Sequence, residues 1–304
     1  MTETVLQFLQ PYSDEDKVDW IVSPQMDQYT SFRIGGLAKL LVYPKSEEVL
    51  IALIEQLKKL GEKYIVLGRM TNLVFSDSYY NGVIICTSKL KELYCTDMTV
   101  TASCGVTLSE LCRFCREADL TGHEFAYGIP GTVGGAVFMN AGAYGGVMAD
   151  ILTSVTYYDA SNGRINTVSA RECAFSYRSS VFRANTNQII LRAEFDLKRG
   201  EGSEIQTRMD EILQKRIASQ PLDYPNAGSI FKRNERCIVS KLLDELGLKG
   251  LRVGDAMISE KHAGFIVNVG KATAADVRAL IQKIKNIVYE RQGIELEEEI
   301  LYIE

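Results

Sequence analysis

The sequence predicts an α+β protein of about two domains, and three observations support this. Its 304 residues are enough for two domains of ordinary size. Strand-like and helix-like segments alternate between residues 39 and 88, which is typical of an α/β unit. Farther on, residues 151–170 have the alternation and turn of an antiparallel hairpin, and a long amphipathic helix lies near the end of the chain.

The first part of the chain is expected to be helical up to about residue 29 and then irregular. After it come four elements, in chain order: a strand at 39–44, a helix at 46–61, a strand at 64–68 and a strand at 82–88. Ser46 is a typical helix N-cap and Gly61 a typical helix end. We expect these elements to form a small α/β unit with parallel strands.

The remaining elements follow from the same signals of periodicity, capping and turns. Thr273 and Asp276 have the spacing of a capping box at the start of an amphipathic helix. The other expected elements are a strand, turn and helix within 98–120, the hairpin 151–170, strand 187–200, helix 204–218, a short helix within 240–250, a strand within 262–270 and a final strand within 294–304.

A change of composition at GEGSEIQTR (200–208) marks a domain boundary. We expect an N-terminal helical segment at 1–28 and a second domain at 201–304, whose last strand returns to the active site. Between them we expect one domain at 29–200, with subdomains of about 29–88 and 89–200.

Bulk composition excludes several classes of protein. A net charge of −5 argues against non-specific binding to nucleic acid. The sequence has no apolar run long enough for a membrane span, and its first residues do not resemble a signal peptide. We therefore expect no nucleic-acid or membrane partner. We also expect a cytoplasmic monomer, although no feature of the sequence determines the oligomeric state.

The seven cysteines are an odd number scattered along the chain, as expected of reduced thiols in a cytoplasm. Cys112 and Cys115 form a C-x-x-C on an expected helix, without a second pair of ligands. Buried thiols on a helix face are the simpler interpretation, and we expect no metal.

The most informative segment is 127–146, YGIPGTVGGAVFMNAGAYGG. Such a density of glycine leaves little side chain for a core and lets a ligand approach the backbone closely. The spacing is neither the G-x-G-x-x-G fingerprint nor a Walker A loop. The segment predicts a bed for a large, rigid and phosphorylated cofactor, with a tight structural crossover as the alternative.

Three further segments carry chemically useful groups. GRMTN (68–72) follows a strand and is suited to a phosphate or a ring edge, although a plain turn fits equally. FSYRSSVFR (175–183) combines two arginines with hydroxyls and aromatics, which suits a carboxylate or phosphate. PNAGSIFKR (225–233) presents Ser229 after a small turn, where a helix cap is the usual role.

Neither histidine offers a triad or a metal spacing. His262 precedes an apolar strand and is interpreted as structural. Glu297, Glu298 and Glu299 are expected on the terminal strand, with Glu298 pointing opposite to its neighbours.

Taken in order, GRMTN, the glycine-rich segment, SYRSSVFR, NAGSIFK, GLKG, KHAGFIVN and LEEEI resemble the UDP-N-acetylenolpyruvoylglucosamine reductases (UDP-N-acetylmuramate dehydrogenases). The resemblance covers roughly residues 29–302, and its compact spacing is similar to the shorter, type II subtype. It implies a two-subdomain FAD-binding fold of the vanillyl-alcohol oxidase and p-cresol methylhydroxylase type, plus a C-terminal α+β substrate-binding domain.

The resemblance also implies the cofactors and the residues that bind them: non-covalent FAD, and NADPH as hydride donor. The expected FAD contacts are Gly68, Arg69, Met70, Thr71, Asn72, Gly128, Ile129, Pro130, Gly131, Thr132, Gly134, Gly135, Asn140, Gly142, Ala143 and Tyr144. In the family the loop at 68–72 is commonly GxGSN, so Met70 stands where glycine is usual.

The implied reaction reduces UDP-N-acetylglucosamine enolpyruvate to UDP-N-acetylmuramate for peptidoglycan synthesis. Arg178 matches the arginine that stabilises negative charge on the substrate carboxylate, and Glu299, if protonated, donates a hydrogen bond to the same group. Ser229 matches the serine that protonates the neighbouring carbon. Tyr177, Lys232 and Arg233 are expected substrate contacts.

Two alternatives of different classes remain at this stage. The FAD bed alone also fits another FAD-dependent oxidase or dehydrogenase of the same fold with a different substrate. A non-catalytic nucleotide- or sugar-binding protein would also keep the scaffold. Substrate-dependent oxidation of NADPH separates both from the reductase.

Overall fold

The computed structural model describes residues 2–304, and they divide into two compact units. The first unit contains the residues up to Val22, Leu40–Arg69 and Gly82–Gln214. The second contains Ser23–Lys39, Met70–Asn81 and Lys215–Glu304, so two segments of the N-terminal half join the C-terminal part. The domain limits expected from the sequence stay a prediction.

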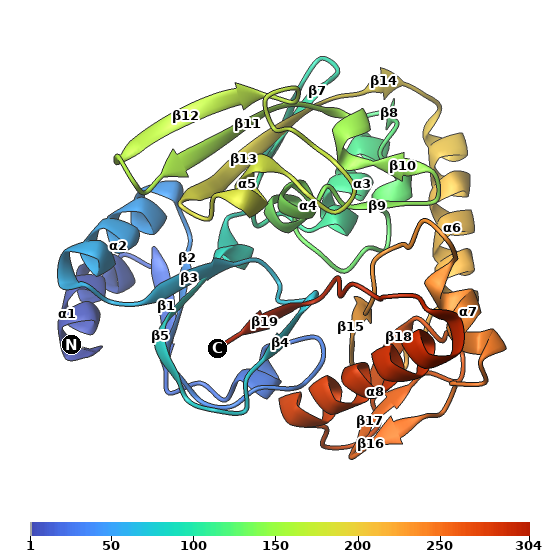
Figure 1. The fold of residues 1–304 in the computed structure, drawn as a ribbon. Helices are drawn as coiled ribbons and strands as arrows, with labels where there is room; N and C mark the ends of the chain where they lie inside the picture. Colours follow the sequence, from blue (N-terminus) through green and yellow to red (C-terminus); the bar gives the residue numbers. More distant parts are fainter. Residues whose placement is uncertain (1) are drawn as a thin grey trace. The chain divides into compact units, whose positions relative to one another are not determined.

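The first unit is built on two sheets (Figure 1). One has the order β1-β2-β5-β3, with β1 antiparallel to β2 and β3 parallel to β5. The other is antiparallel, in the order β12-β11-β13-β7-β6. Their strands are β1 (Val18–Val22), β2 (Ala38–Pro44), β3 (Tyr64–Leu67), β5 (Tyr80–Cys86), β6 (Leu93–Thr96), β7 (Thr99–Ser103), β11 (Leu152–Asp159), β12 (Arg164–Ser169) and β13 (Gln188–Asp196).

Helices and short elements complete the first unit. Its helices are α1 (Thr2–Asp14), α2 (Glu47–Leu60), α3 (Leu108–Glu117), α4 (Val133–Met139), α5 (Val181–Ala184) and α6 (Gly202–Ser219), the last continuing into the second unit. Its short elements are 3-10 turns at Thr87–Lys89, Glu124–Ala126 and Met148–Asp150, and the strand pairs β8 (Leu120–Thr121) with β14 (Lys198–Arg199) and β9 (Gly142–Ala143) with β10 (Gly146–Val147).

Local sequence signals explain why these elements begin and end where they do. Ser46 caps α2 by accepting a hydrogen bond from the Val49 amide, and Gly61 ends it in the left-handed conformation. The predicted hairpin is β11–β12. The parallel pair was correctly predicted at β3–β5, but β1 lies within the N-terminal segment that was expected to be helical, and it is antiparallel to β2.

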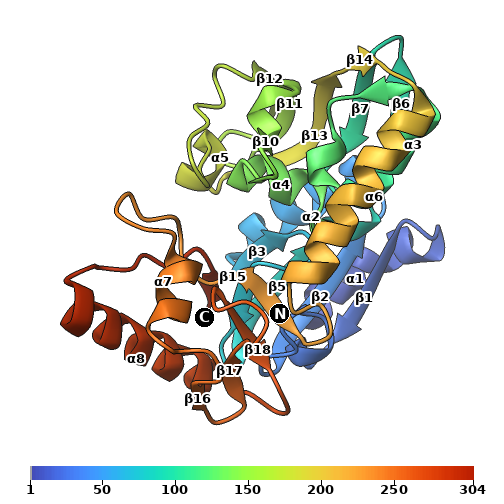
Figure 2. The ribbon, with the colours of Figure 1, turned by 90° about the vertical axis from the view of Figure 1, so that its right-hand side faces the viewer.

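The second unit has an antiparallel sheet in the order β15-β18-β17-β16, with α8 along β16 and β17 (Figures 1 and 2). Its elements are a 3-10 turn at Met26–Gln28, β4 (Leu73–Phe75), β15 (Asn226–Ser229), α7 (Val239–Glu245), β16 (Arg252–Val253), β17 (Ala256–Ile258), β18 (Phe265–Asn268), α8 (Ala274–Gln292) and β19 (Leu301–Ile303). β19 pairs with β4 in parallel.

The apolar face predicted for α8 forms much of the core of this unit. Val277, Leu280, Ile281, Ile284 and Val288 are all buried in it. The predicted capping box is present, because Thr273 accepts from the Asp276 amide and the Asp276 carboxylate accepts from Thr273. Within residues 2–304, no helix is long and apolar enough to cross a membrane.

The predicted final strand is much shorter than expected. β19 covers only Leu301–Ile303, so Glu297, Glu298 and Glu299 are not on a continuous strand. The expected alternation is wrong as well, because Glu297 and Glu299 do not share a face: Glu297 is exposed and Glu299 is buried, while the Glu298 carboxylate binds Lys285 and the Tyr302 hydroxyl.

Candidate active site

The glycine-rich segment is fixed to the chain before α3 by backbone hydrogen bonds. The amides of Leu108, Val133 and Gly134 donate to the carbonyls of Gly131, Val106 and Cys104, at 3.1, 2.8 and 2.9 Å. A Cβ on Gly134 would lie 2.7 Å from the Cys104 Cβ. Gly134 is therefore required by packing inside the protein, whatever the segment binds.

The first part of the 68–72 loop meets the glycine-rich segment. A Cβ on Gly68 would lie 2.6 Å from Oγ1 of Thr132, which is buried and caps α4. Two donors at the end of β5 hold the other side of this loop: the Cys86 thiol donates to the Gly68 carbonyl and the Thr87 hydroxyl to that of Leu67. Two predicted cofactor segments are thus adjacent in the first unit.

Gly131 and Gly135 differ from Gly134 in what surrounds them. Neither has a positive φ, and a Cβ on Gly131 would meet no protein atom within 4 Å. On Gly135 the nearest atom would be Thr132 Oγ1, at 3.7 Å. Neither the backbone angles nor contacts within the protein require glycine at these positions. Glycine there leaves open space beside the backbone, into which a ligand can approach closely. This fits a large ligand such as FAD lying against the segment.

Asn140 connects the glycine-rich segment to the loop that carries Arg178. It ends α4 in the left-handed conformation. Its Nδ2 donates to the Ser176 carbonyl and its Oδ1 accepts from the Ala149 amide, both at 3.1 Å. The side-chain amide is therefore held in place by protein partners at both its nitrogen and its oxygen.

Arg178 lies beside the residues expected to line the flavin. Its Nη2 donates to the Gly142 carbonyl at 3.4 Å, and its guanidinium lies 5.2 Å from the centre of the Tyr177 ring. Tyr144, at the tip between β9 and β10, is 45% exposed and has a positive φ of 50°. Residues 140–146 and 176–183 are thus in contact with each other in the first unit.

The second part of the 68–72 loop belongs to the second unit. Met70 is buried and has a φ of 56°, the backbone region that glycine adopts easily. In the family that the sequence resembles, glycine is usual at this position. Met70 thus adopts the backbone conformation that glycine would have there. Asn72 donates to the Glu299 carbonyl at 3.4 Å and accepts from the Leu301 amide at 3.1 Å.

Ser229 and Glu299, expected as catalytic, come together in this unit. Ser229 is the last residue of β15, which excludes the helix-cap role. The amide of Glu299 donates to the carbonyl of Ile230 at 2.8 Å, and the Ile230 amide donates to Gly264 at 3.0 Å. Ser229 is half-buried and Glu299 is 9% exposed, so both lie at the margin of the interior.

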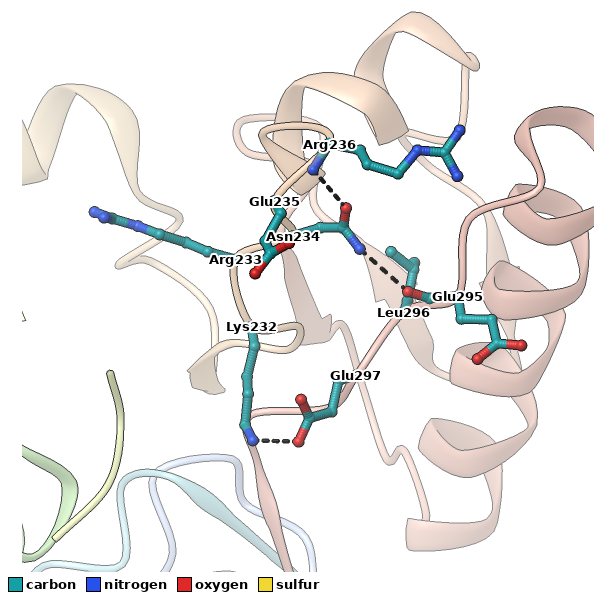
Figure 3. A pocket seen from close by; sticks show the side chains of 8 residues that line it. All are labelled: Lys232, Arg233, Asn234, Glu235, Arg236, Glu295, Leu296 and Glu297. Atoms are coloured by element: carbon teal, nitrogen blue, oxygen red, sulfur yellow. Dashed lines mark hydrogen bonds and ion pairs between the residues drawn. The ribbon is translucent and has the colours of Figure 1, made fainter. Parts of the chain in front are cut away.

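A pocket of about 380 Å³ lies beside residues 295–297, which precede Glu299 in the chain (Figure 3). The Lys232 ammonium forms an ion pair with the exposed Glu297 carboxylate, and the two side chains face one another. Arg233 and Arg236 extend in opposite directions. The lining residues are Lys232, Arg233, Asn234, Glu235, Arg236, Glu295, Leu296 and Glu297.

The described residues 2–304 contain no group of side chains arranged as a metal site. No three His, Cys, Asp or Glu side chains there are arranged to hold a metal ion, and the cysteines are free thiols. Burial raises the pKa of Cys115 to about 12, which makes that thiol unreactive. His262 Nδ1 accepts from the Gly264 amide, as expected of a structural histidine.

Comparison with known proteins identifies the family. A curated reductase from Pseudothermotoga lettingae, "UDP-N-acetylenolpyruvoylglucosamine reductase", is 44% identical over 273 residues, covering 90% of this chain and 93% of the relative. The chain belongs to the UDP-N-acetylenolpyruvoylglucosamine reductase family. The protein of the same name from Caldanaerobacter subterraneus is 42% identical, and the alignment covers 99% of this chain and 98% of that protein.

Domain and structural matches agree with this assignment. Residues 38–169 match the "FAD binding domain" family, and residues 220–303 match "UDP-N-acetylenolpyruvoylglucosamine reductase, C-terminal domain". The crystal structure of the Thermus caldophilus reductase has a TM-score of 0.78 at 33% identity, covering 94% of this chain and 99% of that one. The α+β class and FAD-binding fold predicted from the sequence are confirmed.

The structure also shows functional neighbours that the sequence did not single out. Cys86 and Thr87, which hold the loop at Leu67 and Gly68, lie in an ordinary strand end with no recognisable motif. Arg183 was noted as a second cation for a ligand, yet its guanidinium binds the Arg178 carbonyl. No pattern in a single sequence would have indicated either relationship.

Proposed function

We propose that Arg178, Ser229 and Glu299 carry the catalytic step of this flavoenzyme. The chain is an NADPH-dependent, FAD-containing oxidoreductase that reduces UDP-N-acetylglucosamine enolpyruvate to UDP-N-acetylmuramate in peptidoglycan precursor synthesis. The observation that carries the residue assignment is the hydrogen bond from Glu299 to Ile230, because it places the glutamate beside the residue that follows Ser229.

The proposed FAD site follows the segments predicted from the sequence. Gly68, Arg69 and the run from Gly128 to Gly135 hold FAD in the first unit, with Gly142, Ala143 and Tyr144 beside the flavin. Met70, Thr71 and Asn72 continue the loop. The open space beside Gly131 and Gly135 supports this assignment. FAD bound there would supply the chemistry of hydride transfer from NADPH to the enolpyruvyl group.

Arg178 binds the carboxylate of the enolpyruvyl group. A guanidinium matches a carboxylate with two parallel hydrogen bonds and keeps its charge at any working pH. Negative charge grows on this carboxylate as hydride adds to the terminal carbon of the double bond, so a fixed cation there stabilises the transition state more than the ground state. Tyr177, stacked beside Arg178, is a proposed substrate contact.

Ser229 and Glu299 are proposed to supply the two other groups that act on the substrate. Ser229 gives its proton to the carbon that bears the ether oxygen, which completes the addition across the double bond. A serine hydroxyl is a weak acid, so it requires the strongly basic carbon that forms when hydride has been added. The Glu299 carboxyl group donates a hydrogen bond to the substrate carboxylate alongside Arg178, which requires its protonated form.

Lys232 and Arg233 are proposed to hold the nucleotide part of the substrate. The pocket beside them is lined by three basic and three acidic side chains, and its basic side chains, all within residues 232–236, suit a diphosphate. Glu297 keeps Lys232 in place in the structure. A diphosphate would compete with Glu297 for the same ammonium group.

Turnover with matched substrates tests the proposed activity. Purified enzyme is mixed with NADPH and either UDP-N-acetylglucosamine enolpyruvate or UDP-N-acetylglucosamine, which lacks the enolpyruvyl group. We expect NADPH oxidation only with the first, and UDP-N-acetylmuramate as the product by mass spectrometry. Oxidation of NADPH without that product would favour an oxidase or dehydrogenase of the same fold acting on another substrate.

We also propose that the enzyme is a cytoplasmic monomer. Its seven free thiols are consistent with a reducing compartment. Light scattering after gel filtration should give the chain mass of 33.9 kDa. A value of twice that mass would contradict the monomer.

A further inference from the structure

Arg178 occupies a backbone conformation that arginine rarely adopts. The amides and carbonyls of Ser176 and Ser179 bond to each other at 3.1 and 3.2 Å, which closes a turn with Tyr177 and Arg178 at its centre. Arg178 is the third residue of this turn and has a φ of 55°. Turns with a positive φ there usually have glycine or asparagine at that position. Non-glycine residues in such conformations persist only where the surroundings hold them.

Arg183 is the residue that holds this conformation directly. Its Nη1 donates to the carbonyl oxygen of Arg178 at 2.6 Å. Charge-assisted hydrogen bonds of this length are among the stronger ones in proteins. The contact joins the side chain of one arginine to the backbone of the other, so it fixes the orientation of the Arg178 peptide unit without involving the Arg178 guanidinium, whose Nη2 donates to the Gly142 carbonyl.

The short helix α5, which carries Arg183, is itself anchored to α4 through its N-cap residue Ser180. Ser180, at the start of α5, is 3% exposed and its Oγ donates to the Phe138 carbonyl at 2.8 Å. The Val181 amide donates to Cys173 at 2.9 Å. At the other end of the turn, Asn140 donates to the Ser176 carbonyl. The turn is therefore fixed at both ends, and Arg183 supplies the contact at Arg178 itself.

We propose that Arg183 is a positioning residue: it holds Arg178 in the left-handed conformation and so aims the Arg178 guanidinium at the substrate carboxylate. This inference rests on the role proposed for Arg178. Displacement of a catalytic group by about 1 Å can lower a rate by up to about a hundredfold. The effect is confined to the step in which Arg178 acts, because Arg183 contacts Arg178 through its backbone.

Rapid mixing of the FAD-loaded enzyme separates the two half-reactions. The variants are Arg183→Met, which keeps the aliphatic stem, Arg183→Lys, which keeps a donor, and Arg171→Met as a control at an exposed arginine of the same unit. For Arg183→Met we expect flavin reduction by NADPH within about twofold of wild type, and reoxidation by the enolpyruvyl substrate slower by about 10- to 100-fold. Arg183→Lys should recover part of the rate and Arg171→Met all of it.

A double-mutant cycle with Arg178→Ala tests whether Arg183 acts through Arg178. If it does, adding Arg183→Met to Arg178→Ala should slow reoxidation by less than about twofold further. Full additivity, equal losses in both half-reactions, or wild-type reoxidation in Arg183→Met while Arg178→Ala is slow would overturn the inference. Normal reoxidation in Arg178→Ala alone would instead remove the role proposed for Arg178. Should Arg183→Met not fold, Arg183→Lys and its double mutant carry the same comparison.

Discussion

The amide of Glu299 donates a hydrogen bond of 2.8 Å to the carbonyl oxygen of Ile230, the residue after Ser229. Asn72 extends the same connection, since it donates to the Glu299 carbonyl and accepts from Leu301. Three segments far apart in the sequence are thereby joined through backbone groups of Ile230, Glu299 and Leu301 and through the side chain and carbonyl of Asn72. A change in one side chain here should leave that framework intact, which makes substitutions of Ser229 and Glu299 informative about chemistry.

Ser229→Ala should separate the two half-reactions. It removes only the hydroxyl group, so NADPH should still reduce the flavin at the wild-type rate. Reoxidation by the enolpyruvyl substrate should slow by about 100- to 10,000-fold, the usual contribution of a positioned proton donor. Stopped-flow flavin absorbance measures both rates, with Ser203→Ala, an exposed serine on α6, as control. A normal second half-reaction would refute the proton-donor role.

Glu299→Gln replaces the carboxyl group by an amide of nearly the same shape. The main-chain bonds to Ile230 and Asn72 do not involve that group, so the fold should be kept. Loss of one preorganised donor typically lowers the catalytic rate by about 100- to 1000-fold. The matched control is Glu290→Gln on the exposed face of α8. Equal kcat values for the two variants would show that Glu299 has no part in the reaction.

Two glycines of the same segment, Gly131 and Gly134, should respond differently to substitution by alanine. In Gly134→Ala the new Cβ would meet Cys104 at 2.7 Å, so the apoprotein should lose about 1–3 kcal/mol of stability. In Gly131→Ala the Cβ meets no protein atom, so apoprotein stability should be unchanged while FAD affinity falls at least about tenfold, or ~1.4 kcal/mol. Thermal unfolding of the apoprotein and FAD titration measure the two quantities. Wild-type FAD affinity in Gly131→Ala would argue against the cofactor lying there.

Lys232→Met tests the nucleotide site. It removes the cation that Glu297 binds and keeps most of the aliphatic stem. We expect KM for the sugar nucleotide to rise about tenfold, equivalent to ~1.4 kcal/mol of binding, with flavin reduction by NADPH unchanged. Lys241→Met, at an exposed lysine of α7, is the control for loss of one surface charge. An unchanged KM would place the diphosphate elsewhere.

His123 should make stability depend on pH. It is fully buried and neither ring nitrogen has a hydrogen-bond partner among the described residues. Burial lowers its pKa from the usual 6.5, although the neighbouring Glu124 charge opposes this. Below about pH 6.5 the unfolded chain therefore binds a proton that the folded chain does not, and stability falls by up to ~1.4 kcal/mol per pH unit until the lowered folded pKa is reached.

The comparison of wild type with His123→Leu isolates this contribution. Urea unfolding at pH 7.5 and 5.5 should show a larger loss of unfolding free energy in wild type than in the variant. Groups that do not interact with His123 titrate equally in both proteins and cancel, and the lowered pKa of its neighbour Glu124 keeps that carboxylate ionised over this pH range. The same loss in both would mean that His123 is protonated or solvated in the folded state.

How far the sequence predicted this structure depends on whether the signal was local. The caps at Ser46 and Thr273 act within four residues, so helices α2 and α8 were predicted closely. Strand β1 was missed, because VDWIV follows a charged stretch and gains its conformation from pairing with β2. The final strand was predicted too long. The alternation of LEEEILYI does not show that Glu299 and Leu301 hydrogen-bond to Ile230 and Asn72.

The candidate site shows the same limit. The motifs identified Arg178, Ser229 and Glu299 through their resemblance to a family, since their types and spacing alone named no reaction. The left-handed backbone of Met70 and Arg178 could not be predicted, because neither residue favours it. Those conformations depend on contacts made elsewhere, such as the bond from Arg183.

The flavin spectrum of the purified protein tests the central claim most directly. Under anaerobic conditions the account predicts yellow flavin absorption that NADPH bleaches and that one equivalent of UDP-N-acetylglucosamine enolpyruvate restores, with UDP-N-acetylmuramate formed in equal amount. Bleaching by NADPH without recovery on addition of the enolpyruvyl substrate would contradict it.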